Sequence, residues 1–247
     1  MKENNSEMQI VYHVSRDKEG DVLLGINYEK IKLFTKSGNE ETEMDADNAS
    51  FSVNATEKLL GALKESRIDV VLKPNGILKS VNGFNELTEK VFSRISFPDA
   101  ATKSFSREVW NKTIESGLVK QNIDQFFRIF PDSTVQLHQK WQVESNQSGE
   151  VGLKIKTTYF LKAITNEYVY IDANSQIVSD SSGNNMNHFN VSSQLKGDQS
   201  GEYVLEIRTG MLVSAKLSSS ITGNVIARNT EVPVKIKSKV LIERMKN

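Results

Sequence analysis

The chain has 247 residues, with 31 basic and 31 acidic side chains and no cysteine. Because phosphate contacts need a clustered excess of basic residues, zero net charge argues against a nucleic-acid partner. The lack of cysteine excludes a thiol nucleophile, a thiolate metal site and a disulfide framework. No apolar run reaches the roughly 20 residues that a membrane-spanning helix needs.

Four stretches alternate apolar and polar side chains with a period of two. The first runs through residues 10–14 and 24–28, which a turn at 16–21 separates, and the others cover residues 151–159, 203–207 and 234–242. Because side chains alternate between the faces of a strand, each stretch predicts a strand with one apolar face and one wet face.

A weak internal repeat links three of these hairpin-like segments, residues 69–81, 170–179 and 206–216. Each reads as a strand, a short turn, an aliphatic pair and a serine. Pro74, Asn75 and Gly76 suit the first turn, and Asn174 and Gly210 suit the others. We favour the simpler interpretation that the similarity among these hairpins arose by chance.

Four helices are predicted between the strands. Asn54 and Glu57 have the spacing of a capping box and open the first helix, residues 56–66. Asn82 or Asn85 caps the second, which carries an apolar stripe. The third covers residues 104–116 and the fourth residues 119–130. The stripe of the second helix consists of Phe84, Leu87, Val91 and Ile95.

These elements predict an α+β fold: a strongly curved antiparallel sheet of long hairpins, similar to a half-barrel, with several helices covering one face. No linker rich in proline, glycine or serine interrupts the chain, so we expect a single body over residues 1–247. Within it we distinguish tentative halves at 8–98 and 132–247, separated by a central helical block at 99–131.

Histidines offer no catalytic constellation in this sequence. His13, His138 and His188 are far apart, and none has a metal-ligand spacing such as HExxH. Ser15 with Lys18, and Ser193 with Lys196, match S-x-x-K, but each lies next to a predicted strand, so we interpret both as accidental. We expect that replacing the three histidines by alanine abolishes no activity of the protein.

One acidic cluster could offer oxygen ligands to a hard cation. Four of its members alternate, so on a strand they would share a face. We favour the simpler interpretation of a solvated hairpin tip. The cluster consists of Glu40, Glu41, Glu43, Asp45 and Asp47.

Five large rings lie within 32 residues: Trp110, Phe126, Phe127, Phe130 and Trp141. We expect them to be core, because helices bury apolar stripes against a sheet. In that case Phe126→Ala or Phe127→Ala should cost roughly 3–5 kcal/mol of stability. The alternative is an apolar pocket between sheet and helices that holds a lipid or a similar ligand.

The order of features resembles a family of uncharacterised Bacteroidetes proteins, mostly predicted lipoproteins, defined only as a domain of unknown function. The resemblance rests on INYEKIKL from Ile26, ATEKLLGAL from Ala55, IDVVLKPNGILKSVNG from Ile68, FNELTEKVF from Phe84 and FRIFPDSTVQLHQKWQV from Phe127. It implies an exported, lipid-anchored protein of a Gram-negative envelope. The lipobox cysteine is absent from this sequence.

The polar start MKENNSE, which contains no signal peptide, fits two interpretations: a cytoplasmic protein with a disordered start, or a mature chain trimmed after a signal or lipoprotein cysteine. We expect the second. The native gene should then encode a signal peptide with a cysteine at or just before Met1.

The sequence predicts no catalytic residues, no cofactor and no metal site. The motifs G-x-S-x-G, G-x-G-x-x-G and the P-loop are missing, which removes the commonest hydrolase and nucleotide signatures. We therefore expect a non-enzymatic cell-envelope protein that binds an apolar ligand, a lipid or an envelope protein. The alternative is a structural or interaction subunit of an envelope complex without a small-molecule ligand, and an enzyme comes third.

Overall fold

The computed structural model describes residues 2–37, 39–113, 127–131, 133–147, 152–179, 191–227 and 230–245. The chain divides into two compact units, Met1–Glu115 and Ser116–Asn247. Of the described residues, 59% lie in strands and 18% in helices. None of the helices they form is long and apolar enough to cross a membrane.

The predicted α+β class is wrong, because the fold is mostly β with two open antiparallel sheets. All three α-helices of the described residues belong to the first unit. The described residues of the second unit therefore contain no α-helix. The division into halves at 8–98 and 132–247 around a helical block stays a prediction.

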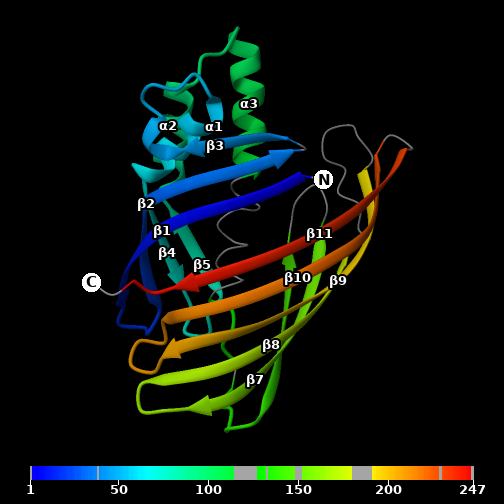
Figure 1. Cartoon of the computed structure of the whole chain (residues 1–247). Helices are drawn as coiled ribbons and strands as arrows, with labels where there is room; N and C mark the ends of the chain where they lie inside the picture. Colours follow the sequence, from blue (N-terminus) through cyan, green and yellow to red (C-terminus); the bar gives the residue numbers. More distant parts are fainter. Residues whose placement is uncertain are drawn as a thin grey trace. The chain divides into compact units, whose positions relative to one another are not determined.

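The first unit contains a five-stranded sheet (Figure 1). Its order is β1-β2-β4-β5, and β3 pairs with β2 beside that path. The predicted turn between β1 and β2 is confirmed, since Asp17 Oδ1 accepts the backbone N–H groups of Glu19 and Asp21, each at 2.9 Å. The strands are β1 (Lys2–Arg16), β2 (Val22–Ser37), β3 (Glu40–Asp45), β4 (Arg67–Leu72) and β5 (Leu78–Asn82).

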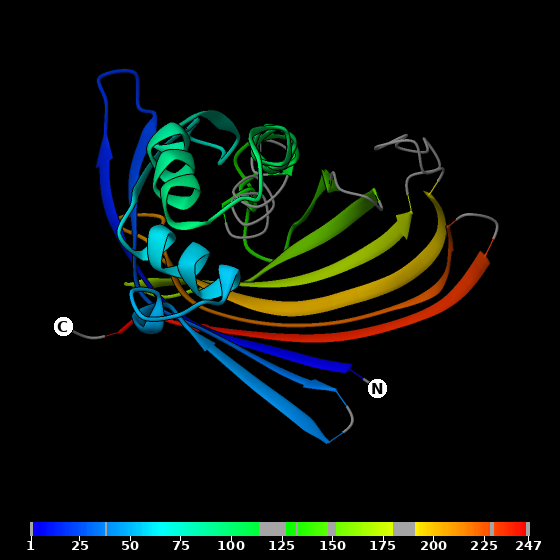
Figure 2. The same cartoon turned by 90° about the horizontal axis from the view of Figure 1, so that it is seen from above.

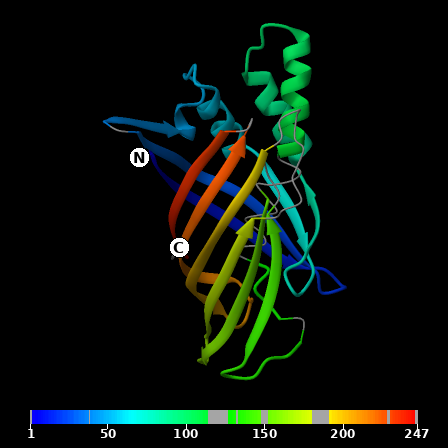
Figure 3. The ribbon, with the colours of Figure 1, turned by 90° about the vertical axis from the view of Figure 1, so that its right-hand side faces the viewer.

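Three helices gather beside this sheet in the first unit (Figures 1 and 3). They are α1 (Ala55–Lys64), α2 (Phe84–Arg94) and α3 (Ala100–Thr113), and a 3-10 turn, Ala46–Asn48, precedes them. The apolar stripe of α2 packs into a cluster with α1, in which Ala62, Leu87, Val91 and Phe92 are buried. Trp110 of α3 packs against this cluster and donates its indole N–H to Thr88 Oγ1 at 2.9 Å.

The helix starts differ in part from the predictions. Asn54 caps α1 as predicted, and its side chain accepts the backbone N–H of Thr56 at 2.8 Å. Glu57 does not close a capping box, because it accepts the backbone N–H of Asp45 at 3.2 Å instead.

Gly83, not an asparagine, precedes α2, with φ of 100° in the left-handed region that glycine tolerates. α3 begins at Ala100, four residues before the predicted start at 104.

Acid should destabilise the corner around Glu57. Hydrogen bonds from the Ser52 side chain and the Asp45 backbone lower the pKa of Glu57. A carboxyl whose folded-state pKa is lowered stabilises the fold above its unfolded-state pKa and loses that contribution as pH falls through the folded-state value. We expect Glu57→Gln to lose less stability than the wild type between pH 7 and pH 3 in chemical denaturation. The matched control is Glu40→Gln, an exposed carboxylate of β3, which should lose as much as the wild type. Equal losses for both variants would contradict this expectation.

The second unit contains one six-stranded antiparallel sheet in the order β11-β10-β9-β8-β7-β6 (Figure 3). β9 and β10 have 16 residues each, which corresponds to about 53 Å at 3.3 Å per residue. Figure 2 shows that β7 to β11 bend along their length. The strands are β6 (Lys140–Gln147), β7 (Leu153–Ile164), β8 (Tyr168–Ser179), β9 (Val191–Glu206), β10 (Leu212–Ala227) and β11 (Thr230–Glu243).

The two faces of this sheet differ in polarity. Tyr159, Ala173, Gly201, Leu217 and Val240 are paired successively from β7 to β11 and therefore share one face. This face contains an apolar cluster whose buried members include Tyr159, Leu161 and Ile171, and Ile129 packs into it from outside the sheet. The opposite face is polar and carries the candidate site.

Three predicted features of this unit differ from the structure. Tyr170 to Ser179 contains no turn, because β8 continues through Asn174, so the proposed repeat does not hold there. Residues 127–130, expected at the end of a fourth helix, form a turn and a bend, and residues 119–126 lie outside the described part of the chain. Ile207, predicted to extend its strand, lies in the turn after β9.

Candidate functional site

A trough with a volume of about 780 Å³ crosses the polar face of the six-stranded sheet. Every strand from β6 to β11 contributes to its lining. Six strands at a spacing of about 4.8 Å span about 24 Å, so the trough is long enough for an extended ligand. The lining residues on this face are Gln142, Lys156, Thr158, Asn174, Gln176, Asp198, Ser200, Ser218, Ser220, Lys237 and Lys239.

The strand register explains why these side chains come together. Thr158, Asn174, Ser200, Ser218 and Lys239 are successive cross-strand partners from β7 to β11. A second row lies two residues further along each strand from the first. It consists of Lys156, Gln176, Asp198, Ser220 and Lys237. Opposite partners in an antiparallel pair point to the same face.

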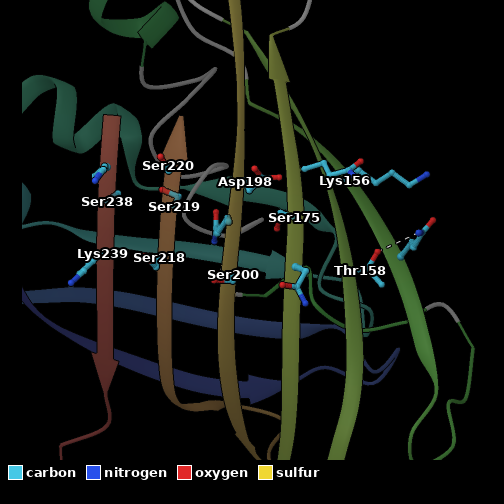
Figure 4. A pocket seen from close by; sticks show the side chains of 15 residues that line it. Lys156, Thr158, Ser175, Asp198, Ser200, Ser218, Ser219, Ser220, Ser238 and Lys239 are labelled. Atoms are coloured by element: carbon cyan, nitrogen blue, oxygen red, sulfur yellow. Dashed lines mark hydrogen bonds between the residues drawn. The ribbon is translucent and has the colours of Figure 1, made fainter. Parts of the chain in front are cut away.

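Side-chain length explains the hollow. Serine occupies the centre of the trough, at Ser200, Ser218 and Ser220, whereas longer side chains stand at both ends. Figure 4 shows the serines of β9 and β10 between Lys239 on β11 and Lys156 on β7. The lysines therefore lie on β7 and β11, and the strands between them carry hydroxyl and amide groups and one carboxylate, Asp198.

A second hollow, of about 700 Å³, continues the trough along the strands. It shares Asn174, Ser200, Ser218 and Lys239 with the first and adds Asp172, Glu202, Lys216 and Leu241 on the same face. Lys162 donates to Asp172 and to Glu202, each at 3.1 Å, and these contacts, with Asp172 first, raise the pKa of Lys162. Lys162 therefore compensates the negative charge of Asp172 and Glu202 in the second hollow.

The chemistry of the trough is that of hydrogen bonding. Hydroxyl and amide groups both donate and accept, so they match a ligand that does the same. In Figure 4 a dashed line joins Gln142 and Thr158, whose side chains bond at 3.3 Å. The described lining contains no histidine and no cysteine.

The two described histidines, His13 and His138, do not line the trough. His13 is exposed on β1, and His138 lies in an exposed turn with φ of 66° and stacks on Phe160. His188 lies outside the described residues. Ser15 and Ser193 of the S-x-x-K matches lie within β1 and β9, as their neighbourhood predicted, and neither begins a helix.

The predicted acidic cluster forms ion pairs with lysines. On β3, Glu43 and Asp45 both contact Lys32 at 2.8 Å, and Glu41 contacts Lys36 at 2.5 Å. The hydrogen bond from Lys32 lowers the pKa of Asp45. These carboxylates share a face, as their alternation predicted, and the lysines of the neighbouring strand neutralise them.

A different acidic group lies in the β1–β2 turn. Oxygen atoms of Asp17, Glu19 and Asp21 lie within 4.8 Å of one another. Lys79 contacts Asp21 at 2.5 Å and Glu19 at 3.4 Å, so an internal cation already compensates these carboxylates. This segment was predicted only as a turn, although the acidic residues at alternate positions 17, 19 and 21 were visible in the sequence.

The predicted aromatic block separates into two clusters. Trp110 packs in the first unit, whereas Phe130 and Trp141 pack in the second. Trp141 stacks on Tyr159 at 5.4 Å and donates its indole N–H to the backbone oxygen of Ile129 at 2.9 Å. Phe127 is buried, in agreement with the core interpretation, and Phe126 lies outside the described residues. None of these rings lines either hollow.

The trough itself was not predicted from the sequence. Two local signals could have indicated it: the serine run at Ser218, Ser219 and Ser220, and the alternating lysines Lys235, Lys237 and Lys239. Each signal covers a single strand, whereas the trough exists only once six strands are paired in register.

Comparison with known proteins gives a family without an assigned function. No curated protein and no solved structure matches this chain. The predicted resemblance to a domain of unknown function is confirmed at that level, whereas the Bacteroidetes origin and the lipid anchor stay predictions. A family model, described as a family of unknown function (DUF6263), matches residues 19–212. Because the match covers well over half of the chain, the protein belongs to the DUF6263 family.

Proposed function

We propose that this protein is a non-enzymatic binding protein whose six-stranded sheet holds an extended, hydroxyl-rich ligand, an oligosaccharide. The trough on the polar face carries the proposal. Its hydroxyl and amide side chains suit a ligand that offers many donors and acceptors along its length. The width of about 24 Å across six strands suits a chain of several sugar units.

The proposal departs from the expected apolar ligand. The buried aromatic and aliphatic side chains of the second unit fill a packed cluster around Tyr159. Most lining residues of the two hollows belong to the opposite face, although Ala173 and Leu217 of the cluster also line the second hollow. A cell-envelope location and a lipid anchor remain part of the proposal, and their support is the resemblance given above. An interaction subunit without a small ligand is the alternative, because the trough is open enough to receive a protein surface.

Calorimetric titration with neutral linear oligosaccharides tests the proposal. The probes are maltohexaose, cellohexaose and fully methyl-esterified hexagalacturonide. At least one should bind with a Kd below about 1 mM, which corresponds to about −4.1 kcal/mol. Ser200→Tyr places a ring in the centre of the trough and should weaken that binding at least tenfold. Because Ser200 is exposed, the stability of the variant should change by less than about 0.5 kcal/mol.

The matched control is Gln194→Tyr. Gln194 is exposed on the same strand and face, six residues from Ser200 and outside the lining. It should bind the probe within twofold of the wild type. Absence of binding by all three probes at several millimolar, or equal effects of both tyrosines, would overturn the proposal.

A further inference from the structure

The lysines at the two ends of the trough differ in their partners. Lys156, at the β7 end, lies 3.5 Å from Glu144, and Lys162 on the same strand contacts two carboxylates. Lys237 and Lys239, at the β11 end, are exposed and have uncharged cross-strand partners, Ser220 and Ser218. Among the described residues, no carboxylate forms an ion pair with either of these two lysines.

The β11 lysine pair, Lys237 and Lys239, has a defined geometry. The two residues are two positions apart on one strand, so their side chains point to the same face and their Cα atoms lie roughly 6.7 Å apart. Both belong to the trough lining. Asp198, which lines the same row as Lys237, is paired with Ser220 of β10 and is thus two strands away from β11.

The charge pattern therefore gives the trough a direction. Its β11 end is positive, whereas the carboxylates Asp172, Asp198 and Glu202 lie on β8 and β9. A ligand with negative charge at one end would meet uncompensated ammonium groups at β11. Asp198 on β9, which lines the trough, would repel a negative charge placed beside it.

We propose that the trough binds an anionic oligosaccharide and that the β11 lysine pair contacts the acidic groups of its sugars. This inference rests on the proposed function and specifies its substrate class. Lysine is a compact point charge with three donors, so it can serve a carboxylate and the neighbouring hydroxyl groups together.

The test compares hexagalacturonate with its methyl ester, which differ in charge and share their ring hydroxyls. In 50 mM NaCl the acid should bind the wild type at least fivefold more tightly than the ester. In 0.5 M NaCl this preference should fall toward one, because the Debye length shortens from more than 10 Å to a few ångströms. A preference that is unchanged by salt would contradict a role for the exposed lysines.

The double substitution Lys237→Gln with Lys239→Gln removes the charge and keeps a hydrogen-bond donor. It should abolish the preference for the acid and leave the affinity for the ester within twofold. The control is Lys196→Gln with Lys235→Gln, which removes two lysines of the same face outside the lining. This control variant should keep more than half of the wild-type preference for hexagalacturonate over its methyl ester.

The outcomes separate the two proposals. Trough-dependent binding of the ester without any preference for the acid would overturn only the inference about charge. Absence of binding by the ester and by the other two neutral probes would overturn the proposed function itself. Binding of phosphatidylglycerol vesicles that the β11 double variant loses and the control retains would assign the lysine pair to a lipid surface and overturn the inference.

Discussion

Replacing Tyr159 by alanine is expected to lower the free energy of unfolding by about 3–5 kcal/mol, the usual cost of emptying a large buried aromatic site. Tyr159 is 4% exposed. Its ring stacks on Trp141 with centroids 5.4 Å apart and meets Tyr203 edge to face at 6.1 Å. The substitution removes both ring contacts and leaves a cavity beneath the six-stranded sheet.

Two control variants test whether this loss of stability comes from the buried ring. Tyr159→Phe keeps the ring and should cost no more than about 1.5 kcal/mol, the net value of a hydrogen bond. Ile164→Ala, at an exposed position of the same strand, should change stability by less than about 1 kcal/mol. If urea denaturation shows equal costs for Tyr159→Ala and Ile164→Ala, the ring cluster is not the core of the second unit.

Replacing Ile31 by alanine should cost about 2–5 kcal/mol, the range for truncating a buried aliphatic side chain. Ile31 lies on β2, is 0% exposed and forms a buried cluster with Ala46 and Leu60. It therefore connects the five-stranded sheet to α1 and the 3-10 turn. Chemical denaturation of the variant measures the cost directly.

The control for this prediction is Val14→Ala on the neighbouring strand β1. Val14 is 41% exposed, so the loss of its two methyl groups should cost less than about 1 kcal/mol. A cost for Ile31→Ala as small as that of the control would show that α1 does not depend on this contact.

Local patterns predicted the strands and their faces but not the fold class. Alternation at residues 234–242 correctly places Val234, Ile236, Val240 and Ile242 on one face of β11, because the period of two is a property of the strand alone. The N-cap at Asn54 was likewise predictable from a few neighbouring residues. The predicted helical end at residues 127–130 is wrong, because the apolar side chains of Ile129 and Phe130 pack from a turn and a bend.

Non-local pairing explains why the candidate site was missed. Asn174 was interpreted as a turn residue, yet it lies within β8 because strands pair on both sides of it. Thr158 and Lys239 belong to one row of the trough although they are far apart in the sequence. A single strand shows only that one face is polar, and the register of six strands is needed to bring the serines together.

Amide chemical shifts recorded during titration with whichever of the three neutral oligosaccharides binds most tightly test the central claim, that the polar face of the six-stranded sheet is a binding surface. The largest changes should fall at Thr158, Asn174, Ser200 and Ser218, which line the centre of the trough. Gln194, on the same face outside the lining, should change little. Changes concentrated in the first unit or around Leu161 and Ile171 in the apolar cluster, or no changes at all, would contradict the claim.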